Sequence, residues 1–98
     1  MLGELEQVVM LATLRLGEDG YGVSIRDAVK RSTARDLTLG TIHKTLVRLE
    51  DKGFIASRMG ESSPHRGGRR KRHYRVTPAG LKMLKASIAA LRLSLIHI

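Results

Sequence analysis

Apolar residues recur with helical spacing in the first third of the chain. Between residues 4 and 16 they stand mostly three or four positions apart, which places their side chains on one face of an α-helix. Residues 17–20 interrupt the pattern, because Gly and Asp-Gly favour turns. A second, shorter helix is predicted after this turn, and residues 32–36 form a linker. The apolar positions are Leu5, Val8, Val9, Ala12 and Leu16 in the first helix and Ile25, Ala28 and Val29 in the second.

The third predicted helix, at about residues 38–52, has the most distinct pattern. Thr38 is a suitable N-cap residue, and Lys52-Gly53 provides a basic last turn and a glycine that can end the helix. We expect a helix that packs through one apolar face and presents a polar, basic face to a groove. The apolar face carries Leu39, Ile42, Leu46 and Leu49, and the opposite face carries Gly40, Thr41, Lys44, Val47, Arg48 and Asp51, with His43 on the flank.

The second half of the chain predicts a hairpin followed by a helix. Residues 54–59 are strand-like, and residues 60–68 are rich in Gly, Ser and Pro. In residues 71–76 the basic positions 71, 73 and 75 alternate with Arg72, Tyr74 and Val76, as in a strand with one basic face. Thr77-Pro78 starts the last helix, because Thr caps an N-terminus and Pro lacks an N–H that the first turn would leave unsatisfied. The fold class is therefore mainly α with a small β-hairpin, in the element order of a winged helix-turn-helix.

The last predicted helix has a narrow apolar seam. Its apolar residues alternate at spacings of three and four, which is the a/d pattern of a helix that pairs with another helix. We expect a homodimer, and the alternative is a helix that folds back on its own domain. Residues 1–77 then form the winged helix domain and residues 78–98 the dimerisation helix. The predicted contact residues are Leu81, Leu84, Ile88, Leu91 and Leu95, with Ile98 continuing the pattern.

Composition limits the chain to one small domain and removes several classes of site. It has 98 residues and no cysteine, which excludes disulfides, iron–sulfur centres and cysteine-based zinc fingers. The N-terminus lacks a basic segment and a cleavage pattern for a signal peptide. No apolar run reaches the roughly 18 residues that cross a bilayer. These features predict a soluble, intracellular protein.

The basic residues are concentrated in one part of the chain. The net charge of +9 comes from 18 Lys and Arg against nine Asp and Glu. Residues 58–75 contain seven basic and one acidic side chain and so carry +6, whereas residues 1–37 carry −1. A concentrated excess of one sign is typical of a polyanion-binding surface, while a solvated loop usually mixes its signs. The charge pattern therefore favours a hairpin that binds a polyanion.

No pattern for catalysis or metal binding stands out. The histidines at positions 43, 65, 73 and 97 lack the short His-to-His spacing and neighbouring carboxylates of a metal site. Residues 17–22 are glycine-rich but lack the Gly-Lys-Ser/Thr of a phosphate-binding loop. No nucleophile and base can be paired from the sequence. We therefore expect neither an enzyme nor a metal or organic cofactor.

Four blocks of sequence together resemble the PadR-like family of bacterial transcriptional regulators. They are residues 2–6 (LGELE), 20–22 (GYG), 40–55 (GTIHKTLVRLEDKGFI) and 70–80 (RKRHYRVTPAG), and the resemblance extends to about residue 84. It implies a winged helix-turn-helix that acts as a homodimer, binds a pseudo-palindromic operator in double-stranded DNA and represses transcription. It also implies the bacterial cytoplasm, at the nucleoid, and in many members a small-molecule effector, which this sequence does not identify.

The resemblance places the third helix in the major groove and the basic wing, residues 58–75, on the minor groove or the backbone. Residues near the start of the recognition helix read base edges or adjacent phosphates, and the start of the second helix can meet a phosphate. His43 stands where family members usually carry a tyrosine. The candidate DNA-binding residues are Tyr21, Ser24, Thr41, His43, Lys44, Arg48, Arg66, Arg69, Arg70, Lys71 and Arg72.

Other interpretations stay open at this stage. An RNA-binding or ribosome-associated module would use the same wing, although three aromatic residues are few for stacking single-stranded bases. A winged helix that binds only proteins is a second alternative. Tyr21 has packing in the core as its other role, and Tyr74 is expected to point inward. Residues 93–98 are more apolar than an ordinary chain end, and we expect a truncated or non-native tail there.

Overall fold

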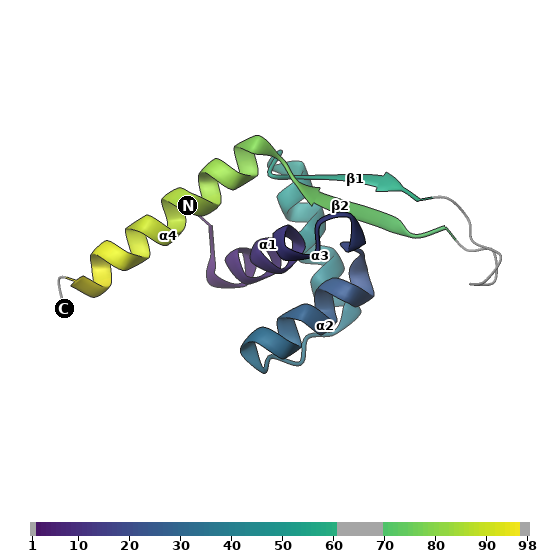
Figure 1. Ribbon diagram of the computed structural model, residues 1–98, viewed down its shortest axis with the longest axis horizontal. Helices are drawn as coiled ribbons and strands as arrows, with labels where there is room; N and C mark the ends of the chain where they lie inside the picture. The colour runs from purple at the N-terminus through teal and green to yellow at the C-terminus, as the bar shows by residue number, and fades with distance from the viewer. Residues whose placement is uncertain (1, 61–69, 97–98) are drawn as a thin grey trace.

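The computed structural model describes residues 2–60 and 70–96. Three helices pack together, the hairpin extends from one side of them, and the last helix extends from the other (Figure 1). The predicted element order is confirmed, with a short 3₁₀ turn added after the first helix. The elements are α1 (Glu4–Leu16), η1 (Gly17–Asp19), α2 (Gly22–Thr33), α3 (Leu39–Asp51), β1 (Ile55–Met59), β2 (Arg72–Val76) and α4 (Pro78–Ile96).

The core lies between the first three helices and one face of the hairpin. The apolar face of α3 is buried at Ile42, Leu46 and Leu49, as the spacing predicts. Leu39 is an exception, because its side chain is 42% exposed in the first turn of α3. These buried side chains stabilise the fold by removing apolar surface from water. The fully buried core also contains Val9, Met10, Ile25 and Val29, with Ile55, Tyr74 and Leu84 nearly so.

Both ends of α3 are capped by the residues that the sequence singles out. The Thr38 hydroxyl accepts a hydrogen bond from the Thr41 N–H at 3.1 Å. At the other end, the Phe54 N–H donates to the Leu49 carbonyl and the Gly53 N–H donates to the Glu50 carbonyl, each at 2.9 Å. This pair of bonds is a Schellman motif, and Gly53 adopts the φ of +79° that the motif requires. The ends of α3 are therefore fixed by local chemistry.

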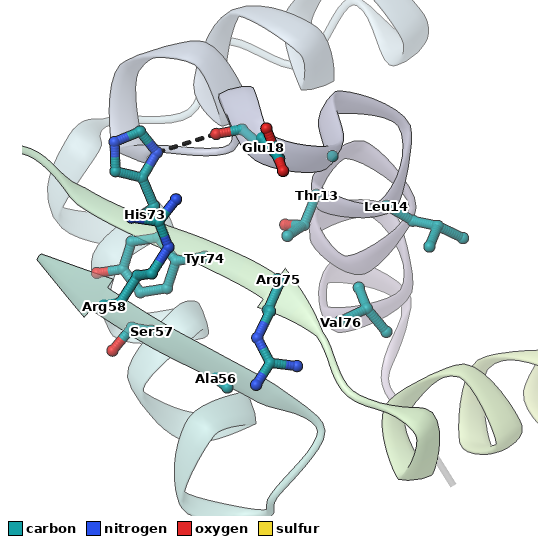
Figure 2. Close-up of a pocket in the computed structure, with 11 residues that line it drawn as sticks. Thr13, Leu14, Glu18, Ala56, Ser57, Arg58, His73, Tyr74, Arg75 and Val76 are labelled. Atoms are coloured by element: carbon teal, nitrogen blue, oxygen red, sulfur yellow. Dashed lines mark hydrogen bonds between the residues drawn. The ribbon is translucent and has the colours of Figure 1, made fainter. Parts of the chain in front are cut away.

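The hairpin is tied to the start of α2. Ser57 pairs with Tyr74 and Arg58 pairs with His73 in its antiparallel register. The Tyr74 N–H donates to the Gly20 carbonyl at 2.7 Å, and Tyr21 forms an isolated bridge with His73. The His73 Nδ1 lies 3.0 Å from the Glu18 carbonyl oxygen, which accepts a hydrogen bond from it (Figure 2). The segment between α1 and α2 thus anchors β2 beside the helices.

The final helix has a buried half and an exposed half. Leu84 is 2% exposed, and the hydroxyl of buried Ser87 accepts a hydrogen bond from the Leu2 N–H at 3.3 Å. Further along, Leu91 and Leu95 are 55% and 62% exposed, and the helix continues away from the other elements (Figure 1). The predicted seam is therefore divided: its first part packs on the chain's own domain, and its last part faces solvent. Within the described residues, no helix combines the length and apolar character needed to cross a membrane.

Candidate nucleic-acid interface

The polar face of α3 is open to solvent. His43, Lys44 and Arg48 are all exposed, on the side opposite the buried leucines. Thr41 is half-buried, and its hydroxyl accepts a hydrogen bond from the Thr38 hydroxyl at 3.0 Å. The helix wheel therefore predicts the orientation of α3 correctly. Three donors, two of them cationic, project from one helical surface.

The base of the wing meets this helix in a shared cleft. Lys71 and Arg72 line the cleft together with His43 of α3 and Tyr21 at the start of α2. The Lys71 Nζ lies 3.9 Å from the centroid of the Tyr21 ring, a cation–π contact that holds the ammonium group beside α2. Residues 21, 43, 71 and 72, which are separated by up to 51 positions in the sequence, thus come together. Their basic groups extend the surface of α3 toward the hairpin.

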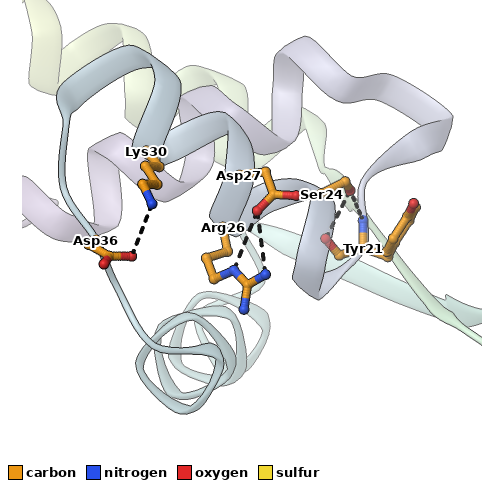
Figure 3. A network of polar contacts seen from close by, with 6 residues as sticks. All are labelled: Tyr21, Ser24, Arg26, Asp27, Lys30 and Asp36. Carbon is orange, nitrogen blue, oxygen red and sulfur yellow. Dashed lines mark hydrogen bonds and ion pairs between the residues drawn. The ribbon is translucent and has the colours of Figure 1, made fainter.

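Some of the predicted site residues lie apart from this surface or outside the described part of the chain. Arg70 is exposed at the entry to β2. Arg66 and Arg69 fall within residues 61–69, outside the described residues. Ser24 caps the start of α2, because its hydroxyl accepts a hydrogen bond from the Tyr21 N–H at 3.0 Å (Figure 3). The same hydroxyl donates to the Asp19 carbonyl at 2.6 Å. The Ser24 hydroxyl is thereby engaged within its own chain.

A polar network joins the wing to the end of α3. The Arg72 guanidinium donates to the Ser57 hydroxyl at 3.0 Å, and that hydroxyl donates to the Glu50 carboxylate at 2.5 Å. Arg72 is nevertheless exposed. One side chain therefore belongs both to the cleft and to the contact that orients the hairpin relative to α3.

Two carboxylates in the first turn of α1 hold the segments at either end of α3. Glu4 pairs with Arg35, which precedes α3, and Glu6 pairs with Lys52 at its end, with 2.8 Å between the charged atoms. Burial of Glu6 raises the pKa of its carboxyl, but the hydrogen bonds from Lys52 and from the Gly3 N–H outweigh it, so the net pKa is lowered. These pairs hold the segments at the two ends of α3 against the start of α1.

Three apolar residues near the interface are not among the predicted binding residues. Val23, Leu39 and Val47 are each about 40% exposed, and the first two line the cleft beside His43. Apolar side chains on a groove-facing surface can contact the methyl group of thymine. The outward position of Val47 on the helix wheel is the signal that could have identified it. Within residues 2–60 and 70–96, no group of histidines and carboxylates is placed to hold a metal ion.

Comparison with known families identifies the chain. The PadR-like family of transcriptional regulators matches residues 10–86, which is most of the sequence. The chain belongs to this family. It is accordingly a transcriptional regulator and not an enzyme, and its helices and hairpin form the winged helix of PadR-like proteins. Among curated proteins, none matches it.

Solved structures of PadR-like proteins share this fold. A PadR-like transcription factor from Bacteroides fragilis is 25% identical, with a TM-score of 0.75 over 95% of this chain and 87% of that one. A PadR family regulator from Clostridium difficile is also 25% identical, with a TM-score of 0.71 over 89% of this chain and 88% of that one. Bacillus subtilis PadR in complex with operator DNA is 24% identical, with a TM-score of 0.70 over 87% of this chain and 48% of that one.

Proposed function

We propose that this PadR-like protein binds a specific sequence in double-stranded DNA and thereby represses transcription. Its proposed location is the bacterial cytoplasm, at the nucleoid. The observation that carries the proposal is the shared cleft, which brings His43 of α3 together with Lys71 and Arg72 at the base of the wing. A helix of this width fits the major groove of B-DNA, and the adjoining cations would meet the phosphates. The solved complex of Bacillus subtilis PadR with operator DNA supports double-stranded DNA as the partner.

Each residue of the surface has a proposed role that follows from its position. Thr41, His43 and Lys44 lie in the first half of α3 and contact base edges or the adjacent phosphates. Arg48, one turn further along, contacts a phosphate or a guanine. In the wing, Arg70, Lys71 and Arg72 follow the minor groove or its backbone, with Arg66 and Arg69 as proposed contacts from residues 61–69. Tyr21 contacts a phosphate beside Lys71, and Ser24 orients Tyr21 through its cap.

We also propose that the protein acts as a homodimer through the outer half of α4. Leu91 and Leu95 lie one helical turn apart and are more than half exposed. A second copy of α4 would cover them and extend the seam that begins with Leu81, Leu84 and Ile88. A two-fold dimer requires a pseudo-palindromic operator with half-sites about one helical turn of DNA apart.

DNase I footprinting on the region upstream of the protein's own gene tests the DNA-binding proposal. We expect a protected two-fold site, and a weakening of about tenfold for Lys44→Gln or Arg48→Gln. Lys82→Gln, which changes an exposed lysine on α4, is the matched control and should bind as the wild type does. A lack of binding at low salt, or equal binding by the three variants, would contradict the proposed surface.

Competition with RNA separates the main alternative function from this one. Duplex RNA of the same sequence should compete weakly, because the deep, narrow major groove of A-form RNA does not admit a helix. RNA that competes as well as DNA would favour an RNA-binding module instead. A reporter gene placed behind the footprinted region then tests repression, which predicts lower expression when the protein is present.

A further inference from the structure

The outward face of α3, opposite the buried leucines, carries a single apolar side chain. Val47 is 39% exposed and has Lys44 and Asp51 as its neighbours one helical turn before and after it. In the described part of the chain, its side chain is not among those that pack on the hydrophobic core. A β-branched residue is also a weaker helix former than lysine or alanine. Neither packing nor helix formation therefore accounts for a valine at this position.

A valine on a surface that enters the major groove has one suitable partner. Its side chain neither donates nor accepts a hydrogen bond, so over a polar base edge it would displace water without replacing the lost bonds. The C5-methyl group of thymine is the apolar group that the major groove presents. Contact between that methyl group and Val47 removes apolar surface of both partners from water. The side chain of Val47 therefore favours an A·T pair over a G·C pair.

The neighbours of Val47 indicate where on the operator this contact lies. Lys44 precedes it by three residues, which is about 4.5 Å along the helix axis. Successive base pairs are about 3.4 Å apart, so Val47 meets a base pair one or two steps from the one beside Lys44. Asp51 follows on the same face, and phosphates would repel its carboxylate. The contact of α3 with base edges therefore ends near Val47.

We propose that Val47 is a specificity-determining residue that contacts the C5-methyl group of a thymine in the operator. The inference rests on the proposed function, because it assigns a base to the face of α3 that enters the major groove. Lys44 and Arg48 hold the helix on the DNA, and Val47 selects the base pair between them. Burial of one methyl group corresponds to a factor of about four in affinity.

Replacement of thymine by uracil tests the proposal, because uracil keeps the base pairing of thymine and lacks only the C5-methyl group. Each thymine of the footprinted duplex is replaced in turn by deoxyuridine, and fluorescence anisotropy gives the dissociation constant. At least one replacement should weaken binding by the wild-type protein about three- to fivefold. The same replacement should change binding by Val47→Ala less than about twofold, because the shorter alanine side chain does not reach the methyl group. Since Val47 lies outside the core, this variant should keep the wild-type fold.

Two controls separate this contact from other effects. Leu14→Ala removes an exposed apolar side chain from α1 and should keep the full response to deoxyuridine. A C·G pair placed at the responsive position should bind the wild-type protein about three- to fivefold better when the cytosine carries a 5-methyl group. Val47→Ala should not distinguish the two forms of cytosine.

The outcomes distinguish this inference from the proposed function. A deoxyuridine response that is equal in the wild type and in Val47→Ala overturns the inference, because another residue then contacts the methyl group. A scan in which no thymine methyl group affects binding overturns it as well. A wild-type protein that binds no duplex at low salt overturns the proposed function, and the inference falls with it.

Discussion

The ion pair between Glu6 and Lys52 joins α1 to the end of α3 and so helps to hold the helix that carries the proposed DNA-binding face. The Glu6 carboxyl has a lowered pKa in the folded protein. The ion pair therefore stabilises the fold fully at pH values above the pKa that this carboxyl has in the unfolded chain. That contribution is lost as the pH falls through the folded pKa. We expect Glu6→Gln to lower the free energy of unfolding by about 0.5–1 kcal/mol at pH 7, with the difference shrinking below about pH 4. Urea unfolding at several pH values measures it.

Glu4→Gln is the comparison for this variant. Glu4 forms an ion pair too, with Arg35, but the Glu4 side chain is 78% exposed, against 15% for Glu6. Solvent screens the more exposed pair, so its loss should have the smaller effect. A Glu6→Gln variant as stable as the wild type at pH 7 would show that Lys52 and Glu6 contribute nothing to folding.

At the residue scale, the sequence predicts those features that depend on nearby residues. The caps at Thr38, Gly53 and Thr77 are all correct, because each one is made by backbone and side-chain groups a few positions away. Leu39 is placed on the apolar face by its spacing, yet it is exposed. A helix wheel gives the direction of a side chain but not the depth to which neighbouring elements cover it. The contact between Lys71 and Tyr21 could not be predicted for the same reason.

At the scale of the element, α4 is seated by a close approach to the chain that leaves α3. The Thr77 N–H donates to the Phe54 carbonyl at 3.0 Å, and a Cβ at Gly80 would collide with that same carbonyl. We expect Gly80→Ala to lower the free energy of unfolding by about 2 kcal/mol or more, because a backbone group must move. Urea unfolding measures the change.

The same substitution in another helix provides the control. A Cβ at Gly40 in α3 would meet only the Thr38 hydroxyl, at an ordinary 3.8 Å. Gly40→Ala should therefore leave stability unchanged or raise it by up to about 1 kcal/mol, since alanine loses less backbone entropy in a helix. Equal destabilisation by both substitutions would mean that the approach to Phe54 is not what limits position 80.

The divided seam of α4 shows what periodicity can and cannot predict for an element. The three-and-four spacing correctly indicates one apolar face along the helix. It cannot say what covers that face, because Leu84 against its own domain and Leu91 against solvent have the same spacing. The folded-back alternative describes the first half of α4, and pairing with a second copy stays a prediction for the exposed second half.

At the scale of the whole molecule, the dimer proposal depends on the outer half of α4. Leu91→Asn with Leu95→Asn should give a monomer that keeps its fold, because both side chains are exposed in the single chain. Leu93 is 58% exposed but points to the opposite side of the helix, so Leu93→Asn should leave the dimer intact. Sedimentation velocity measures the three species. A monomeric wild type, or a dimer that only Leu93→Asn disrupts, would contradict the proposed seam.

The salt dependence of DNA binding also belongs to the whole molecule. About six cations from α3 and the wing are proposed to meet phosphates in each chain. The logarithm of the binding constant should then fall with the logarithm of salt concentration at a slope of about −5 per chain. Fluorescence anisotropy from 50 to 300 mM salt measures the slope. Binding that hardly changes over this range would show that the basic wing lies away from the backbone.

The junction between β2 and α4 has a mechanical consequence. A single residue, Thr77, separates the strand from the 19-residue helix, so no flexible linker lies between them. A helix of this length is about 28 Å long. A tilt of about 10° at its root displaces its tip by about 5 Å, which exceeds the rise of about 3.4 Å between base pairs. In the proposed dimer, a small rotation near Thr77 would therefore change the distance between the two winged helix domains. The distance between half-sites that the dimer can bind would change with it.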